Sequence, residues 1–377
     1  MVKFMQKSQR TKVISSIRQM ISEGKYTAGN RLPTEHELAE VLNVSRGTVR
    51  SGLRELVAEG VLEQRPGVGS FVSSLLARRP AGTEHAADKT KVLFLVSMRK
   101  GEFNSQLLEG MESVLFRHGL ELAIYNIADS LEKVGQILKR VNLDTCAGIL
   151  FSPVILPNYY DINSRILDCL DQTGIKYVVV DSPVAENGVI RGNFVGSDGY
   201  TAEREIVRYL TEAGHRRIGS IRVFNSVYTA DQRFSGICDE LRRQRLSLAP
   251  ELHTVIEDVP LHEQGRQRVR EMIALPDPPT AIICSHDVIA MNVIDELDKL
   301  SRKVPDDISI IGFDDETFSA TFNLSTVRQP FREIGARAAE ILLENKKQGR
   351  YQEFLPCRLI ERKTVANKNT TIKKGEQ

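Results

Sequence analysis

Two helices and a hairpin are encoded in RLPTEHELAEVLNVSRGTVRSGLRELVAEGVLEQRPGVGSFV, residues 31–72. Thr34 and Glu37 have the S/T-x-x-E spacing of a capping box and predict a helix that starts after Thr34. Ser45 is a favourable N-cap residue and predicts a second helix that ends at Gly60. Short β-type runs at 61–62 and 70–72 flank a turn at 65–69, which is typical of a small hairpin.

Another helix is predicted ahead of this run by apolar residues at helical spacing, Val13, Ile14, Ile17 and Ile21, followed by Gly24. Three helices and a hairpin in this order describe a winged helix-turn-helix. Basic and hydroxyl side chains crowd the first turn of the third helix, the end that enters the major groove in helix-turn-helix proteins. The alternative is a helical mini-domain whose arginines only keep it soluble.

The charge distribution favours a polyanionic partner for this segment. Residues 1–80 carry 13 Lys/Arg and 7 Asp/Glu, whereas the remainder of the chain carries 38 and 42. The formal net charge of the whole chain is only +2. A basic head on a mildly acidic body indicates that nucleic acid, if bound, meets the head alone.

Residues 31–72 closely resemble the GntR-type winged helix over almost their whole length, for example at Arg31-Leu32-Pro33, Val44-Ser45-Arg46, Thr48-Val49-Arg50 and Phe71-Val72. A guanidinium can fork onto guanine O6 and N7 or hold a phosphate. One departure is Gly52, where the family usually has alanine; it should cost the helix about 1 kcal/mol. The resemblance implies a set of DNA-binding residues with two glycines at the wing tip: Arg31, Ser45, Arg46, Thr48, Arg50, Gly67 and Gly69.

Beyond a polar linker at 76–90, apolar runs alternate with amphipathic helical stretches. The runs include KVLFLV (91–96), YVVVDS (177–182) and AIICSH (281–286), and the helices are predicted at 105–118, 201–213 and 287–300. Continuous apolar strands alternating with helices predict parallel sheets that are covered on both faces. We therefore expect the α/β class: a winged helix at 1–75, two doubly wound lobes at 91–365 and a disordered tail at 366–377.

Polar residues follow several of the apolar runs. In open parallel sheets, ligands bind at the carboxyl ends of the strands. One such residue alone is more often an N-cap or a turn residue, but several together, with Arg233 at the start of a helix, predict a cleft. Carboxylates and a guanidinium in one cleft are good partners for vicinal hydroxyls. The strand-end residues are Ser97, Asp181, Asp198, His286-Asp287 and Asp314-Asp315.

Residues 91–365 resemble the effector domain of the lactose/purine-repressor (LacI) family, a periplasmic-binding-protein-like fold, in stretches such as GHRRIGSI and VPDDISIIGFDD. His286 is a departure, because the family usually has asparagine there. The family's own small DNA-binding domain is replaced by the GntR-type head, a combination that resembles arabinose-type repressors and suggests a pentose. With the strand-end Ser97, the predicted effector-binding set is Ser97, Phe103, Asp181, Arg233, His286, Asp287, Asp314 and Gln329.

Other features restrict the compartment and the chemistry. The cysteines lack any CxxC pair, and Cys146, Cys238 and Cys284 lie in or beside apolar runs, which predicts buried free thiols in a reducing compartment. The first residues lack the apolar run of a signal peptide, and no stretch has the length of a membrane span. Histidines and cysteines lack metal-ligand spacing. We therefore expect a cytoplasmic protein with no metal and no cofactor.

These features predict a homodimeric transcriptional regulator, most simply a repressor, whose partners are operator DNA and a small sugar. One alternative is a sugar-processing enzyme with a DNA-binding head. Neither GxxxxGK[ST] nor GxSxG is present, and strand alternation would point Ser285 and Asp287 away from His286, so no catalytic triad is expected. The other alternative is a transport-type sugar-binding protein, which the predicted head disfavours.

Overall fold

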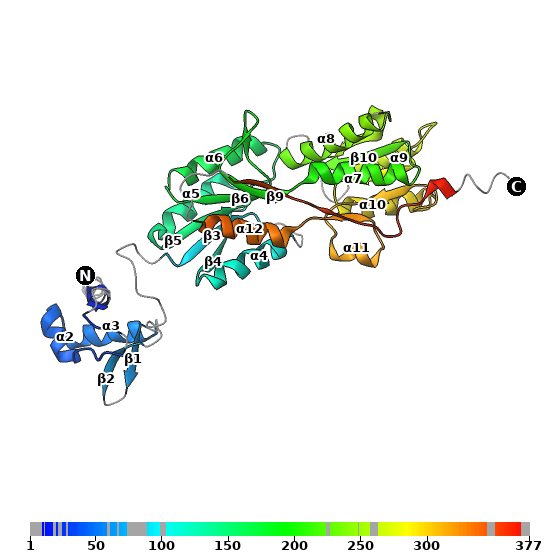
Figure 1. Ribbon diagram of the computed structural model, residues 1–377. Coiled ribbons are helices and arrows are strands. Elements are labelled where there is room, and N and C mark those ends of the chain that lie inside the picture. Colours follow the sequence, from blue (N-terminus) through cyan, green and yellow to red (C-terminus); the bar gives the residue numbers. More distant parts are fainter. Residues whose placement is uncertain are drawn as a thin grey trace. The chain divides into compact units, whose positions relative to one another are not determined.

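A computed structural model describes residues 10, 12–17, 20–21, 25–27, 29–58, 61–65, 68–73, 89–98, 103–223, 227–247, 249–256, 263–344 and 351–370. The chain divides into two compact units, Met1–His85 and Ala86–Gln377 (Figure 1). Each unit is described by itself.

The smaller unit is a helical domain with a hairpin. Residues 12–17 are helical and are followed by α2 (Glu35–Leu42), α3 (Arg46–Ala58), β1 (Leu62–Arg65) and β2 (Gly69–Val72), the last two paired antiparallel. The capping box is confirmed, since the Thr34 backbone N–H donates to Glu37 Oε2 at 2.7 Å and the Glu37 N–H donates to Thr34 Oγ1 at 3.3 Å. The predicted end of α3 at Gly60 lies outside the described residues.

Gly52 now has a packing explanation. Its Cα lies on the buried face of α3, and a Cβ there would come within 2.9 Å of Val13 Cγ1. The first helix therefore packs closely on α3 because position 52 has no side chain. The same apolar cluster includes Ile17, Leu38 and Leu56.

The first lobe of the larger unit is built on a six-stranded parallel sheet of order β15-β9-β6-β5-β3-β4. Alternate residues of β3 enter two different cores, so helices cover both faces of the sheet. Helices α4 and α12 cover one face and α5 and α6 the other. The bounds are β3 (Lys91–Val96), α4 (Phe103–Arg117), β4 (Glu121–Asn126), α5 (Leu131–Arg140), β5 (Cys146–Phe151), α6 (Tyr159–Asp171), β6 (Tyr177–Asp181), β9 (Asn193–Ser197), α12 (Phe331–Leu343) and β15 (Gln352–Leu355).

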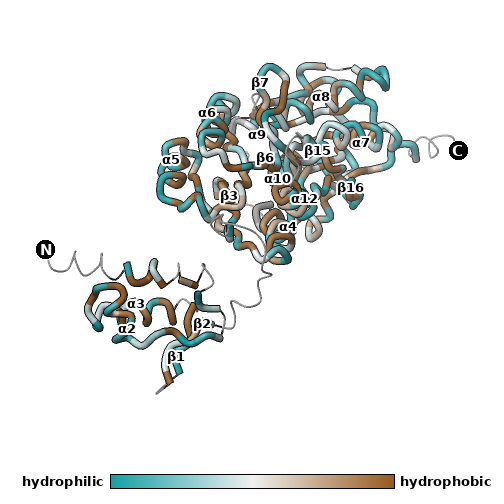
Figure 2. Tube along the Cα trace, turned by 60° about the vertical axis from the view of Figure 1, so that its left-hand side comes forward, coloured by the Kyte–Doolittle hydropathy of each residue, from teal (hydrophilic) through white to brown (hydrophobic). Residues whose placement is uncertain are grey.

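The second lobe has a four-stranded parallel sheet of order β11-β10-β12-β13. Helices α7 and α8 pack on one face and α9 and α10 on the other. Figure 2 shows the resulting amphipathic pattern as alternating hydrophilic and hydrophobic turns along the helices. The bounds are α7 (Gly199–Glu212), β10 (Ile218–Val223), α8 (Tyr228–Arg243), β11 (His253–Ile256), α9 (Glu263–Ile273), β12 (Ala281–Cys284), α10 (Asp287–Lys299) and β13 (Ser309–Ile311).

The chain passes between the two lobes three times: from β9 to α7, from β14 to α12, and from β15 to β16. Strands β14 and β16 pair antiparallel. The remaining short elements are η2 (Leu143–Thr145), β7 (Ala185–Glu186), β8 (Val189–Ile190), η3 (Pro250–Leu252), α11 (Thr317–Thr321), β14 (Thr326–Arg328), β16 (Arg358–Ile360) and η4 (Lys368–Thr370).

The predicted fold class, an α/β chain with parallel sheets behind a winged helix, is confirmed. Cys146, Cys238 and Cys284 are buried free thiols, as expected. The C-terminal tail differs from the prediction of disorder from Ala366, because the Lys368 backbone N–H donates to the Ala213 carbonyl and Asn369 Nδ2 donates to the Glu212 carbonyl, both at 2.7 Å. Among the described residues, no helix is long and apolar enough to cross a membrane.

Candidate functional site

A cavity of about 460 Å³ lies between the two lobes. The first lobe contributes Gln106, Ile155 and Phe331 to its wall, and the carboxyl end of β6 contributes Asp181. The second lobe contributes strand ends and the start of α8. The polar residues that the second lobe contributes to the cavity wall are Glu203, Ser220, Arg222, Thr229, Arg233, Ser285, His286, Asp314, Asp315 and Glu316.

Arg233 is the central cation of this cavity. Its guanidinium lies over the ring of Phe313, 3.6 Å from the centroid, and Nη1 donates to the Ser285 carbonyl at 3.2 Å. Its Nε is buried and has no hydrogen-bond partner among the described residues. The aromatic contact therefore fixes the guanidinium while leaving donor capacity for a ligand.

Asp181 and Asp314 flank this cation. Both have left-handed backbone conformations, with φ of 74° and 113°, which non-glycine residues adopt rarely and most often at functional sites. Burial raises the pKa of both carboxyls to about 6, and the Arg233 guanidinium opposes this rise. Two desolvated carboxyls beside one guanidinium form the arrangement expected for binding hydroxyl groups.

Gln329 ties the cavity to two of the passages between the lobes. Its Nε2 donates to Asp314 Oδ1 at 2.7 Å, and its Oε1 accepts from Ser197 Oγ at 2.5 Å. Ser197 ends β9, and Gln329 directly follows β14. Asp314 is therefore linked by hydrogen bonds to two of the segments that connect the lobes.

His286 lines the cavity as a neutral imidazole. Burial and, to a lesser extent, the charge of Arg233 lower its pKa to about 3. Its Nδ1 lies 3.0 Å from Ser285 Oγ. The residue can therefore donate or accept one hydrogen bond at neutral pH without adding charge.

Three residues of the predicted set are not shown at the cavity wall. Ser97 Oγ accepts a hydrogen bond from the Asp129 N–H at 2.9 Å, away from the lining residues. Asp287 is fully buried and accepts from Ser319 Oγ and Thr326 Oγ1, both at 2.6 Å, which fixes α11 to β14. The side chain of Phe103 lies outside the described part of the chain.

The assignment of Asp287 to the ligand site is therefore not supported by its geometry. The residue follows a strand end, but its carboxylate turns into the protein to satisfy buried hydroxyls.

Three charged cavity residues, Glu203, Arg222 and Glu316, were not found from the sequence. Glu203 is 2% exposed, and its Oε2 has no hydrogen-bond partner among the described residues. Burial raises its pKa to about 8. The helical spacing indicates that Glu203 is buried, because it lies on the same face of α7 as the buried Ile206 and Val207. Arg222 interrupts the apolar run of β10, which is a comparable signal.

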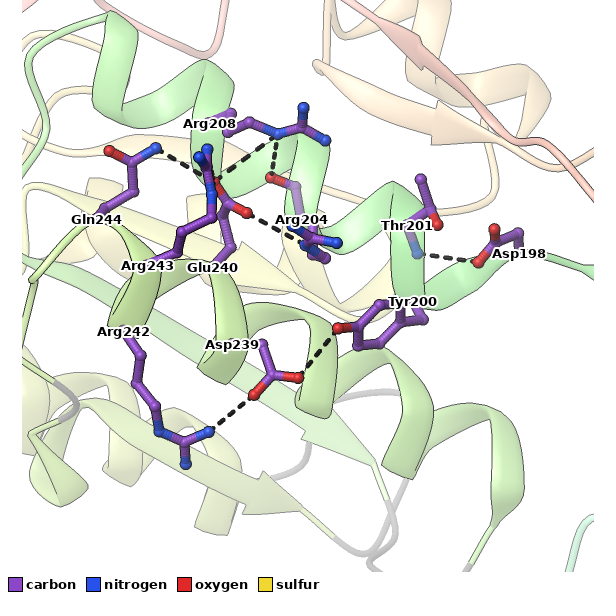
Figure 3. Close-up of polar contacts among 10 residues, drawn as sticks. All are labelled: Asp198, Tyr200, Thr201, Arg204, Arg208, Asp239, Glu240, Arg242, Arg243 and Gln244. Atoms are coloured by element: carbon purple, nitrogen blue, oxygen red, sulfur yellow. Dashed lines mark hydrogen bonds and ion pairs between the residues drawn. The ribbon is translucent and has the colours of Figure 1, made fainter.

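Helices α7 and α8, which carry Glu203 and Arg233, are joined by a buried carboxylate (Figure 3). Glu240 has no exposed side-chain surface, and it accepts from Arg243 Nη2 at 2.6 Å and from Arg204 Nε at 3.2 Å. Arg208 lies 3.8 Å away. Hydrogen bonds from Arg243 lower the pKa of Glu240 to about 2. This cluster holds the second-lobe wall of the cavity in place.

The predicted recognition helix is α3, and its first turn is exposed. Ser45 caps it, since its Oγ accepts from the Thr48 N–H at 3.2 Å. Arg46 and Arg50 are both exposed, and Arg50 is held by Glu35 through Nε and Nη2, the shortest contact being 2.7 Å. This pairing raises the pKa of Arg50 and lowers that of Glu35.

The hairpin places Arg31, another predicted DNA-binding residue, beside Gly69 of the wing. A Cβ at Gly69, where φ is 134°, would lie 3.0 Å from Arg31 Nε, so glycine gives the Arg31 side chain room to lie across β2. Arg31 itself is exposed. Gly67 lies outside the described residues.

Comparison with known proteins agrees with both units. Residues 9–72 match the bacterial regulatory proteins of the gntR family, and residues 207–365 match the periplasmic binding protein-like domain. The arabinose metabolism transcriptional repressor of Halalkalibacterium halodurans is 24% identical over 377 residues, which cover 97% of this chain and 97% of that protein.

Two solved structures share the fold of the larger unit. A putative transcriptional regulator LacI from Bacillus cereus subsp. cytotoxis NVH 391-98 aligns with a TM-score of 0.62 and 25% identity, over 74% of this chain and 99% of that one. A LacI family transcriptional regulator from Enterococcus faecium with bound ribose aligns with a TM-score of 0.60 and 20% identity, over 74% and 99%. The chain is therefore a transcriptional regulator in which a GntR-type DNA-binding domain precedes a periplasmic-binding-protein-like effector domain.

Proposed function

We propose that this regulator binds operator DNA as a homodimer and that a small sugar in the cavity controls its affinity for the operator. The observation that carries the proposal is that Arg233, Asp181 and Asp314 line one cavity of about 460 Å³, where the charge of Arg233 acts on both carboxyls. Such a set offers donors and acceptors to vicinal hydroxyls. The arabinose metabolism repressor and the ribose-bound regulator support a sugar, and a pentose such as arabinose is the first candidate.

DNA recognition is assigned to the exposed start of α3 and to the hairpin. Arg46 and Arg50 would read base edges or hold phosphates, Thr48 lies on the same turn, and Arg31 with the wing would contact the backbone. Two copies would place their recognition helices in half-sites about one helical turn apart. In this scheme the dimer represses in the absence of sugar.

Ligand control requires a link from the cavity to the DNA-binding head. The bonds from Gln329 to Asp314 and from Ser197 to Gln329 connect the cavity to the passages between the lobes. A sugar that binds the closed lobes better than the open ones would favour closure. A coupling free energy of about 1–3 kcal/mol would change operator affinity 5- to 150-fold.

The cavity geometry favours binding over catalysis. The carboxylate of Asp287 is bonded to Ser319 and Thr326, so it does not orient His286. Asp287 therefore does not supply the third group that a hydrolytic triad of Ser285 and His286 would need.

Two variants separate the proposed activities. Arg46→Ala should weaken binding to operator DNA selected from a random pool while leaving sugar affinity unchanged. Asp314→Asn should weaken sugar binding while leaving operator binding intact. Asp239→Asn, an exposed aspartate on α8, is the matched control and should change neither. If Asp314→Asn binds the same sugar with wild-type affinity, the cavity assignment is wrong; if Arg46→Ala binds DNA normally, the recognition helix is misassigned.

A further inference from the structure

The cavity has a second cation, Arg222. Arg222 lies near the carboxyl end of β10 and lines the cavity together with Thr229 and Ala230 of α8. Its guanidinium lies 3.7 Å from the centroid of the Phe234 ring, so its plane is fixed by packing. Its Nε is buried and has no hydrogen-bond partner in the described part of the chain.

No carboxylate among the described residues forms an ion pair with Arg222. Asp231 is the carboxyl whose charge reaches it, and burial raises the pKa of Asp231. Arg233 lowers the pKa values of Asp181 and Asp314, against the effect of burial. Arg222 is therefore a cation on the cavity wall that has no ion-paired carboxylate in the described part of the chain.

The start of α8 adds to the positive potential of the cavity wall. Helix α8 begins at Tyr228, and its N-cap residue Val227 provides no side-chain hydrogen bond to the free N–H groups of the first turn. Val227, Thr229 and Ala230 all line the cavity. The N-terminus of a long helix favours an anion through its dipole and its N–H groups.

Arg222 lines the cavity with no ion-paired carboxylate among the described residues, and a guanidinium is the side chain best suited to a planar carboxylate. We propose that the sugar sensed by this protein is a sugar acid, a uronate or an aldonate, whose carboxylate pairs with Arg222 while its hydroxyls bind Arg233, Asp181 and Asp314. The inference rests on the proposed function and names the class of effector.

The test compares each acid with its neutral parent by isothermal titration: D-galacturonate with D-galactose, D-glucuronate and D-gluconate with D-glucose, and L-arabinonate with L-arabinose. D-galactose 6-phosphate is included as the phosphate arm. We expect at least one acid to bind the wild-type protein about tenfold or more tightly than its parent sugar, because a charge-assisted hydrogen bond is lost in the neutral compound. This comparison needs no variant.

Three variants locate the effect. Arg222→Met, which keeps a side chain on Phe234, should lose the preference for the acid, and Arg222→Lys should retain part of it. Arg242→Met, an exposed arginine on the same helix as Phe234, is the matched control and should keep the full preference. Operator binding by each variant verifies that it is folded.

The outcomes separate this inference from the proposed function. If neutral sugars bind as tightly as the acids, or if the preference survives Arg222→Met, the inference is wrong and the sugar-sensing function stands. Binding of the phosphate in preference to every acid would also overturn it. If no compound of either class binds, both the inference and the proposed sugar-binding function fail.

Discussion

Replacing Glu203 with glutamine should change how the stability of the effector domain depends on pH. The carboxyl of Glu203 is 2% exposed and lines the cavity, and burial raises its pKa from 4.5 to about 8. Between these two pH values the unfolded chain has released this proton and the folded chain still holds it. The free energy of unfolding of the wild-type domain therefore falls as pH rises from about 4.5 to about 8, and this contribution is constant above that.

The size of the effect follows from the shift in pKa. One pKa unit corresponds to about 1.4 kcal/mol, so a rise from 4.5 to about 8 sets an upper limit of about 5 kcal/mol on what the wild-type domain loses. Relaxation and water entry around the ionised group reduce this, and we expect about 2–3 kcal/mol. A glutamine side chain cannot ionise, so the Glu203→Gln variant should gain that amount relative to the wild type between pH 5 and pH 9.

The measurement is urea unfolding of the ligand-free protein, followed by circular dichroism at pH 5, 7 and 9. Asp181 and Asp314 titrate in both proteins, so the difference between wild type and variant isolates Glu203. Glu205→Gln, at an exposed position on the same helix, is the control and should show no such gain. A stability difference between wild type and Glu203→Gln that stays constant from pH 5 to pH 9 would refute the account of a desolvated carboxyl in the cavity.

Three further changes test other parts of the structure. Arg46→Ala should weaken operator binding by about 1–3 kcal/mol in fluorescence anisotropy, and unchanged affinity would remove this residue from the DNA interface. Gly52→Ala would gain about 1 kcal/mol of helix propensity, but the new Cβ would lie 2.9 Å from Val13 Cγ1. We therefore expect the melting temperature of the DNA-binding domain to fall. A rise in this temperature would contradict the packing argument. Glu240→Ala should lower the free energy of unfolding of the effector domain in urea by about 3 kcal/mol, because three arginines lose a buried partner. The control Asp239→Ala, at the surface, should lower it by less than about 1 kcal/mol. Equal losses in the two variants would show that the buried cluster stabilises the domain no more than a surface ion pair does.

The elements of the fold were predictable where local signals and burial agree. The capping box at Thr34 and Glu37 and the cap at Ser45 place the starts of α2 and α3, because these contacts lie within four residues of chain. Buried parallel strands such as β3 and β12 show continuous apolar runs. Strand β15 was not predicted, because it is an edge strand of four residues whose burial alternates.

The candidate site was predictable in its location and less so in its composition. Residues at strand ends, such as Asp181 in the first lobe and Asp314 in the second, reach the cavity because each parallel sheet places its strand ends together at one edge. Asp287 follows the same rule, yet its carboxylate faces inward, since hydroxyls from α11 and β14, distant in the sequence, compete for it. Glu203 and Arg222 lie within regular elements, where only the interruption of an apolar pattern marks them.

The central claim is that a ligand in the cavity controls binding of DNA by a domain elsewhere in the chain. It is tested most directly by measuring operator affinity with and without whichever compound of the sugar and sugar-acid panel binds most tightly. We predict a 5- to 150-fold change in the wild-type protein, and an equal change in the affinity for that compound when operator is present, because coupling is reciprocal. Loss of binding in Arg233→Leu would show that the compound binds in the cavity. If such a compound left the operator affinity of the wild-type protein unchanged, the account would be contradicted.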